Sequence, residues 1–217
     1  MAAIKTIGVV GAGQMGNGIA HVCALAGYDV VLNDISEDAL KAGLVTIEKN
    51  MTRQVARDLI TPDELTAGLA RIKTSTSMDP LGGADLAIEA ATENRDVKEA
   101  IFRSLCQVVP DHAILATNTS SISVTRLASV TDRPERFIGL HFMNPVPLMK
   151  LVEIIRGLAT DQETYEAAIG VAERLGKTVT NAEDYPAFIV NRILMPMINE
   201  AVYTCLLYTS PSPRDRG

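Results

Sequence analysis

Ile7-Gly8-Val9-Val10-Gly11-Ala12-Gly13-Gln14-Met15-Gly16 is the stretch of sequence that decides the fold. It begins in a short apolar run, from Ile4 to Val10, which predicts a β-strand. The glycines then interrupt this run, and the chain continues as a helix-like segment from Gln14 to Ala26. A strand, a G-x-G-x-x-G turn and a helix in this order are typical of a dinucleotide-binding site.

Each glycine of the turn has its own task. Gly11 makes the tight turn out of the strand, Gly13 lets the backbone approach a pyrophosphate, and Gly16 lets the helix lie close to the sheet. The start of the helix offers free N–H groups and a partial positive charge to the phosphates. A chain with a net negative charge can therefore bind an anionic cofactor at this turn.

An acidic residue follows at the place that a dinucleotide site requires. The segment from Tyr28 to Leu32 is predicted to be the second strand, and Asp34 lies just beyond it, 18 residues after Gly16. A carboxylate at this position can accept hydrogen bonds from the ribose hydroxyls of NAD and would repel the 2′-phosphate of NADP. The sequence therefore favours NAD as the cofactor.

The composition narrows the class of protein. The chain has 217 residues, of which 47% are hydrophobic and 21% charged, and its formal net charge is −6. This size suits one large domain, or one domain and part of another. The absence of a basic run argues against nucleic-acid binding. No apolar run reaches the roughly 18 residues of a membrane-spanning helix. We therefore expect a cytoplasmic protein with neither nucleic-acid nor membrane partners.

The cysteines and histidines give no sign of a metal site. Cys23, Cys106 and Cys205 are odd in number and far apart, which predicts neither a disulfide framework nor zinc binding and indicates a reducing compartment. Cys23 and Cys106 are expected to be core residues. His21 and His112 are interpreted as surface or packing residues.

Short apolar strands alternate with amphipathic helices along the chain. This pattern predicts an α/β fold, a Rossmann-type doubly wound and mostly parallel sheet. Two helices, from Ser36 to Arg57 and from Thr61 onward, are predicted as an inserted helical pair. A last strand is predicted to start at 177–179, and the polar segment 181–186 is predicted to be the domain boundary. Phe188 is then expected to open a long apolar helix, the first of an incomplete all-helical domain. The predicted division is residues 1–184, residues 185–205 and an atypical tail, 206–217, expected to be foreign or disordered.

Polar residues gather where the predicted strands end. Asn118 to Ser121 follow one strand directly, and His141 ends the strand that begins at Phe137. Glu153 lies in the middle of an apolar strand, where an unpaired carboxylate would cost several kcal/mol. A histidine partner would remove that cost. Simpler interpretations stay open: Ser120 as the cap of a helix over 122–129, Asn191 as a polar spot on a helix, and His141 as a structural histidine.

Several separated stretches, in this order, resemble the L-3-hydroxyacyl-CoA dehydrogenase family, and within it the bacterial enzymes that act on 3-hydroxybutyryl-CoA. The resemblance extends from residue 1 to about residue 204. It rests on six segments: 11–20, Thr92-Glu93-Asn94, Asn118 to Ser121, Gly139 to Pro147, Lys150 to Glu153, and Phe188 to Arg192.

The resemblance implies a role for each site residue. His141 would be the general base of an alcohol oxidation, and Glu153 would hold its other ring nitrogen. Ser120 and Asn191 would bind the substrate oxygens. The residues implied in NAD binding are Gly11, Gly13, Gln14, Met15, Gly16, Asp34, Glu93, Lys98, Ser120 and Asn144. Arg53 and Arg57 are weaker candidates for the CoA phosphates, because Asp58 stands where a lysine is expected.

The implied reaction is the NAD-dependent oxidation of a (3S)-3-hydroxyacyl-CoA, with 3-hydroxybutyryl-CoA favoured, to the 3-ketoacyl-CoA, and its reverse, in fatty-acid or butanoate metabolism. Two alternatives stay open. One is a related dehydrogenase of a free hydroxy acid such as gulonate, and the other is a non-catalytic NAD-binding protein. The family also implies a homodimer formed through C-terminal helices that this chain lacks. We therefore expect the chain to bind NADH but to turn over poorly and to aggregate.

Overall fold

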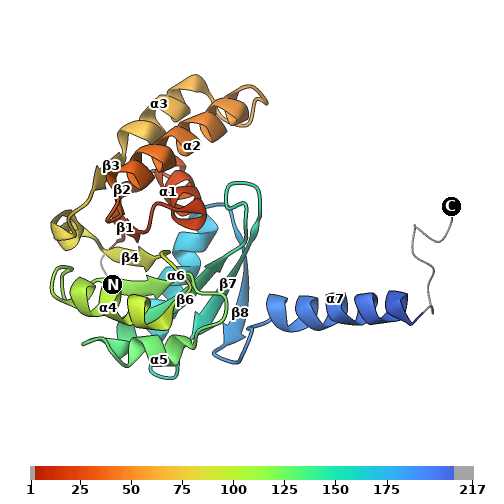
Figure 1. Ribbon diagram of the computed structural model, residues 1–217. Coiled ribbons are helices and arrows are strands. Elements are labelled where there is room, and N and C mark those ends of the chain that lie inside the picture. The colour runs from red at the N-terminus through yellow and green to blue at the C-terminus, as the bar shows by residue number, and fades with distance from the viewer. Residues whose placement is uncertain (1–2, 208–217) are drawn as a thin grey trace, which may run out of the picture.

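A computed structural model describes residues 3–207 of the chain. Its centre is one eight-stranded sheet with the order β3-β2-β1-β4-β5-β6-β7-β8 (Figure 1). All neighbouring strands are parallel except β6 and β7, which are antiparallel. The strands are β1 (Thr6–Val10), β2 (Asp29–Asn33), β3 (Ile72–Ser75), β4 (Leu86–Glu89), β5 (Ile114–Thr117), β6 (Phe137–Phe142), β7 (Leu151–Arg156) and β8 (Thr178–Glu183).

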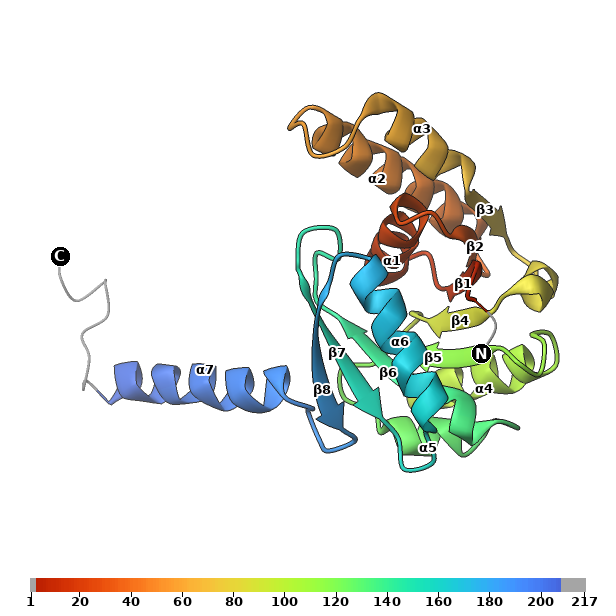
Figure 2. The same cartoon turned by 180° about the vertical axis from the view of Figure 1, so that it is seen from behind.

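Helices cover both faces of the sheet. The core on one face contains α1 (Gln14–Leu25) and α6 (Gln162–Arg174), and the core on the other contains α4 (Arg95–Cys106) and α5 (Val124–Ala128) (Figures 1 and 2). Successive strand residues serve opposite cores, since side chains alternate between the faces of a strand. The predicted doubly wound fold is confirmed. Such a sheet binds ligands at the carboxyl ends of its strands, where the strand order reverses, here between β1 and β4.

The inserted helical pair is present as predicted. It consists of α2 (Glu37–Val55) and α3 (Pro62–Ala70), which pack on α1 and project at one end of the molecule (Figure 1). The Ser36 hydroxyl accepts a hydrogen bond from the backbone of α2. Thr61 and Glu64 form a capping box at the start of α3. Such caps satisfy N–H groups that have no partner inside the helix, so these local residues fix both helix starts.

The end of the sheet differs from the prediction. The last strand, β8, runs to Glu183, into the segment predicted as the domain boundary, and Asn181 is aligned with Ile154 of β7. Polar residues fit here because β8 is an edge strand with a solvent-exposed side. The segment predicted as a boundary therefore begins inside the sheet.

The last helix also begins later than predicted. Ala187 and Phe188 have positive φ angles of 68° and 52°, so α7 (Val190–Leu206) starts only after them. Phe188 does not open the helix but lies buried in front of it, at 4% exposure. Figures 1 and 2 show α7 leading away from the sheet, and large apolar side chains along it are exposed. Most of the predicted tail, residues 208–217, lies outside the described residues.

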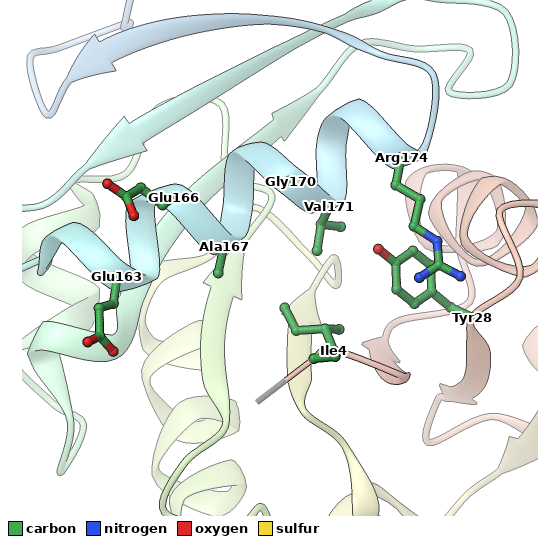
Figure 3. A pocket seen from close by; sticks show the side chains of 9 residues that line it. Ile4, Tyr28, Glu163, Glu166, Ala167, Gly170, Val171 and Arg174 are labelled. Carbon is green, nitrogen blue, oxygen red and sulfur yellow. The ribbon is translucent and has the colours of Figure 1, made fainter. Parts of the chain in front are cut away.

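One hollow of the molecule lies away from the carboxyl ends of the parallel strands. It is formed by α6 and by the residues just before β1 and β2, which mark the amino ends of these strands. The Arg174 guanidinium lies over the Tyr28 ring, 4.2 Å from its centre (Figure 3). Stacking of this kind joins α6 to the strand beside it. The hollow is thus at the edge opposite the candidate site.

No helix within residues 3–207 is long and apolar enough to cross a membrane. The same residues hold no cluster of histidine, cysteine and acidic side chains that could bind a metal ion. The three cysteines are free thiols. Cys23 is a core residue as predicted, and burial raises the pKa of its thiol to about 12. Cys106 is half-buried and packs against the core that contains α4 and α5.

His21 is fully buried, whereas His112 lies at the surface beside Asp85. The Nε2 atom of His21 lies 3.0 Å from the Gln54 side-chain oxygen, and its Nδ1 has no hydrogen-bond partner within the described part of the chain. Burial lowers the pKa of His21 below its ordinary value of 6.5, and the hydrogen bond to Gln54 offsets this only in part. The folded state therefore holds a neutral His21.

The buried His21 makes stability depend on pH. Below pH 6.5 the unfolded chain binds a proton at His21 that the folded chain does not, so stability falls as the pH decreases toward the lowered pKa. We expect the melting temperature to fall between pH 7 and pH 5, and to fall less in His21→Leu. The slope of Tm against pH, measured by circular dichroism, is the readout. An unchanged slope in His21→Leu would contradict the assignment.

Candidate active site

The glycine turn between β1 and α1 is tightly built where the sequence analysis expects it to be. Gly11 has a φ angle of 103°, which favours glycine. A Cβ atom on Gly16 would lie 1.7 Å from the carbonyl oxygen of Gly11. A Cβ on Gly13, in contrast, would meet no atom within 4 Å. The protein's own backbone thus requires glycine at positions 11 and 16, whereas Gly13 faces open space where a ligand can approach.

Asp34 lies beside this turn, just after β2. One of its carboxylate oxygens accepts a hydrogen bond from the Ala12 backbone N–H at 2.8 Å, and the other accepts from Ser36 N–H at 2.9 Å. Each carboxylate oxygen can accept more than one hydrogen bond. Asp34 therefore ties the glycine turn to the end of β2 and keeps acceptor capacity for a ligand.

A cavity of about 420 Å³ opens at the carboxyl ends of the central strands. It brings together seven of the residues that the resemblance implies, each from a different element or loop. Its lining residues are Met15, Ala90, Ala91, Glu93, Lys98, Asn118, Ser120, His141, Phe142, Met143, Asn144 and Asn191. Arg53 lies elsewhere, in the last turn of α2, and Arg57 lies just after that helix.

His141 and Glu153 form a buried pair across the antiparallel strands β6 and β7. They are aligned directly opposite each other, which brings their side chains together on one face. The His141 Nδ1 atom lies 2.6 Å from a Glu153 carboxylate oxygen, and the two residues are 7% and 0% exposed. With Nδ1 donating to the carboxylate, Nε2 is left as an acceptor. The pair therefore presents a proton acceptor on a residue that lines the cavity.

The second oxygen of Glu153 holds the start of α7. It accepts hydrogen bonds from the backbone N–H groups of Ile189, at 3.0 Å, and Val190, at 2.9 Å. Burial raises the pKa of Glu153, but these bonds and the one from His141 outweigh it, so the pKa lies below its ordinary value. The Phe188 ring lies 5.8 Å from the His141 ring, centre to centre. One carboxylate thus fixes both the histidine and the helix that carries Asn191.

Glu93 organises the loop that carries Ser120. One Glu93 oxygen accepts hydrogen bonds from the backbone and hydroxyl groups of residues 119–121, at 2.6 to 3.2 Å. Burial raises the pKa of Glu93, but these bonds and the Lys98 charge outweigh it and lower the pKa overall. Asn191 also reaches the loop, since its side-chain N–H donates to the Ser120 carbonyl at 3.3 Å.

The helix-cap interpretation of Ser120 is wrong. The helix α5 begins at Val124 and not at residue 122, and Ser123 is its N-cap. The start of α5 is also held by Asp184, which accepts hydrogen bonds from the backbone N–H groups of Val124 and Thr125 at 2.9 and 2.8 Å. The Ser120 hydroxyl is therefore free of a capping role.

Sequence reasoning missed Glu89, at the carboxyl end of β4. Glu89 is fully buried, and both of its oxygens lie 2.7 Å from the Lys98 ammonium nitrogen. Lys98 itself is only 1% exposed, although it lines the cavity. The sequence does contain a sign of it: Glu89 is a carboxylate at the end of an apolar strand, just as Glu153 is a carboxylate within one. Sequence reasoning also missed a structural role of Asn118. Its side-chain oxygen accepts a hydrogen bond from the Phe142 backbone N–H at 2.9 Å, which joins the end of β5 to β6.

Arg53 and Arg57 line a separate hollow of about 300 Å³ between α2 and the loop after β6. Both side chains are exposed, and none of the described residues that line this hollow is acidic. The other lining residues are Asn50, Gln54, Leu59, Pro145, Pro147 and Leu148. The loop that forms one wall follows directly on the strand that carries His141, so this hollow and the cavity share one segment of the chain.

The glycine turn, Asp34 and the cavity at the switch point define an NAD-binding domain of the dehydrogenase class. The chain belongs to the 3-hydroxyacyl-CoA dehydrogenase family: residues 6–185 match the family model "3-hydroxyacyl-CoA dehydrogenase, NAD binding domain". The chain is an NAD-dependent oxidoreductase, and the prediction of NAD as its cofactor is confirmed.

Named relatives agree with this assignment. The chain is 61% identical over 203 residues to a 3-hydroxybutyryl-CoA dehydrogenase of Bradyrhizobium diazoefficiens. The aligned region covers 94% of this chain and 69% of the relative. It is 48% identical to a probable 3-hydroxybutyryl-CoA dehydrogenase of Bacillus subtilis, over 92% of this chain and 70% of that one. The crystal structure of an (S)-3-hydroxybutyryl-CoA dehydrogenase from Ralstonia eutropha matches with a TM-score of 0.94 at 48% identity, covering 98% of this chain and 75% of that chain.

Proposed function

We propose that this protein interconverts (3S)-3-hydroxyacyl-CoA and 3-ketoacyl-CoA, with 3-hydroxybutyryl-CoA as the preferred substrate. The observation that carries the proposal is the buried His141–Glu153 pair beside a cavity at the cofactor-binding edge of the sheet. The printed names of the relatives support the choice of substrate.

His141 acts as the general base of this reaction. Its Nε2 takes the proton of the substrate hydroxyl in the oxidation and returns it in the reduction. Glu153 keeps the imidazole in the required tautomer and stabilises the imidazolium that forms. Ser120 and Asn191 hold the substrate oxygens by hydrogen bonds. NAD, when bound, supplies the hydride acceptor.

The cofactor site extends from the glycine turn into the cavity. The backbone of Gly11, Gly13 and Gly16, with Gln14 and Met15 at the start of α1, would hold the pyrophosphate. Asp34 would hold the ribose, and its carboxylate favours NAD over NADP. Glu93, Lys98, Ser120 and Asn144 would lie at the nicotinamide end. The cavity lining supports this last group.

We further propose that Arg53 and Arg57 bind phosphate groups of CoA, because their hollow combines two cations with apolar walls. Replacing both by glutamine is expected to raise the KM for acetoacetyl-CoA about tenfold, equivalent to ~1.4 kcal/mol. The kcat should stay unchanged, since neither residue lines the cavity. Steady-state kinetics of NADH oxidation measure both constants. Lys41→Gln, an exposed change on the same helix, is the matched control, and an unaltered KM in the double variant would refute the assignment.

We propose that residues 1–184 form the NAD-binding domain and that α7 begins a second, helical domain through which two copies pair. The family match ends at residue 185, which supports this boundary. The exposed apolar side chains of α7, including Ile193, Met197 and Val202, support burial of this helix against further helices.

A dehydrogenase of a free hydroxy acid is the alternative that the site must be tested against. The purified protein, at high concentration, is mixed with NADH and either acetoacetyl-CoA or free acetoacetate. We expect the absorbance of NADH to decrease with the thioester and not with the free acid. NADPH in place of NADH should give a much slower decrease. Equal rates with the free acid would contradict the proposed substrate class.

A further inference from the structure

Three charged side chains other than the proposed catalytic pair form a chain along the cavity wall. Glu89 lies behind the wall, and Lys98 and Glu93 line it. The Lys98 nitrogen lies 2.7 Å from both Glu89 oxygens and 3.5 Å from a Glu93 oxygen. One cation thus stands between two carboxylates, which leaves the group with a net charge of one negative unit.

The environment of Glu89 fixes it in place. One oxygen also accepts a hydrogen bond from the Ala91 backbone at 2.8 Å, and the other accepts from the Thr117 hydroxyl at 2.8 Å. Glu89 therefore takes four hydrogen bonds and has no contact with solvent. A buried ion pair of this kind is weak evidence for a role in stability, because well-packed apolar residues often serve as well. Its position at the ligand-binding edge points to a role in binding.

The charge on this wall discriminates between the two states of the cofactor. The nicotinamide ring is cationic in NAD⁺ and neutral in NADH, so a fixed negative charge beside it favours NAD⁺. We propose that Glu89 is a positioning residue that holds Lys98 in the wall and cancels its charge, so that Glu93 leaves a net negative charge facing the nicotinamide. This inference rests on the proposed function, which puts the nicotinamide end of NAD in this cavity.

Changing the charges should shift the relative affinities in opposite directions. In Glu89→Gln the wall becomes neutral, and the ratio of Kd for NAD⁺ to Kd for NADH should rise on the order of tenfold, which is the size of effect that one unit charge has over roughly 10 Å at an effective dielectric constant of about 20. In Lys98→Met the wall becomes more negative, and the ratio should fall. The double variant restores one net negative charge and should return the ratio close to the wild-type value.

The glutamine variant is compatible with the fold. Its amide oxygen can accept from Lys98 and Ala91, and its amide N–H can donate to the Thr117 hydroxyl, which is both a donor and an acceptor. The Lys98 ammonium, which lies 2.7 Å from both Glu89 oxygens in the wild type, then has to move toward the amide oxygen and away from the amide nitrogen. Asp184→Asn is the matched control, because Asp184 is also a partly buried carboxylate with several hydrogen bonds but does not line the cavity. It should leave the ratio unchanged.

The experiment measures the Kd values of NADH and NAD⁺ by fluorescence titration and calorimetry for the full chain and its four variants. Opposite shifts in the single variants, cancelled in the double variant, support the role of Glu89. Equal loss of affinity for both cofactor states would show a purely structural role and overturn the proposal. If the wild type itself does not bind NADH, the result contradicts the proposed function, and with it the proposed role of Glu89.

Discussion

Replacing His141 with glutamine is expected to slow NADH oxidation by acetoacetyl-CoA about 10²- to 10⁴-fold, the usual contribution of a positioned general base. Glutamine can still donate a hydrogen bond to Glu153, but it cannot take up a proton at working pH. The rate is best measured in a single turnover, with the protein in excess over NADH. The Kd of NADH should change by less than about twofold, because the glycine turn, which binds the pyrophosphate in our account, is untouched.

The control for this prediction is His112→Gln. His112 is an exposed histidine at the other end of the domain, beside Asp85, and its replacement should leave the rate unchanged. Glu153 keeps its two backbone hydrogen bonds from the start of α7 in the His141 variant, so the fold should survive. A His141→Gln variant with the wild-type rate would show that another group accepts the proton.

Replacing Gly16 with alanine is expected to abolish measurable NADH binding and to destabilise the domain by about 3 kcal/mol or more, at the upper end of overpacking effects. The added Cβ atom would lie 1.7 Å from the Gly11 carbonyl oxygen, and a backbone atom cannot move aside as a flexible side chain can. The start of α1 would have to leave its place above the turn. Fluorescence titration with NADH and thermal unfolding measure the two effects.

Gly170→Ala is the matched control for Gly16→Ala. Gly170 lies on the exposed face of α6, and a Cβ atom there would meet nothing within 4 Å. Because alanine favours helix over glycine by about 0.5–1 kcal/mol, this variant should be slightly more stable than the wild type and bind NADH equally well. A Gly16→Ala variant that binds NADH normally would show that the turn is not the pyrophosphate site.

Local signals in the sequence predict the cofactor half of the site well. The glycine turn, Asp34 and the caps of α2 and α3 depend on contacts between residues close in the chain, which a sequence displays directly. The His141–Glu153 pair was implied by the resemblance to the family, and the cost of burying a lone carboxylate supported it. The structure brings the two side chains together through the alignment of β6 with β7.

Features that depend on strand pairing could not be predicted. The polar segment 181–186 indicates a domain boundary, yet pairing with β7 keeps its first residues in an edge strand. Phe188 continues an apolar helical pattern, but the positive φ angles before α7 turn it into the core beside His141. Glu89, in contrast, is a charged residue at the end of an apolar strand, which the sequence displays; it was overlooked because its partner, Lys98, lies on a different element, the helix α4.

The most direct test of the account is to identify the products formed from acetoacetyl-CoA and NADH by the purified chain. Chromatography of the mixture, at high protein concentration, should show 3-hydroxybutyryl-CoA and NAD⁺ appearing in equal amounts, and neither product with His141→Gln on the same time scale. This would join the NAD site, the histidine–glutamate pair and the acyl-CoA substrate in one reaction. Bound NADH that yields no 3-hydroxybutyryl-CoA would contradict the account.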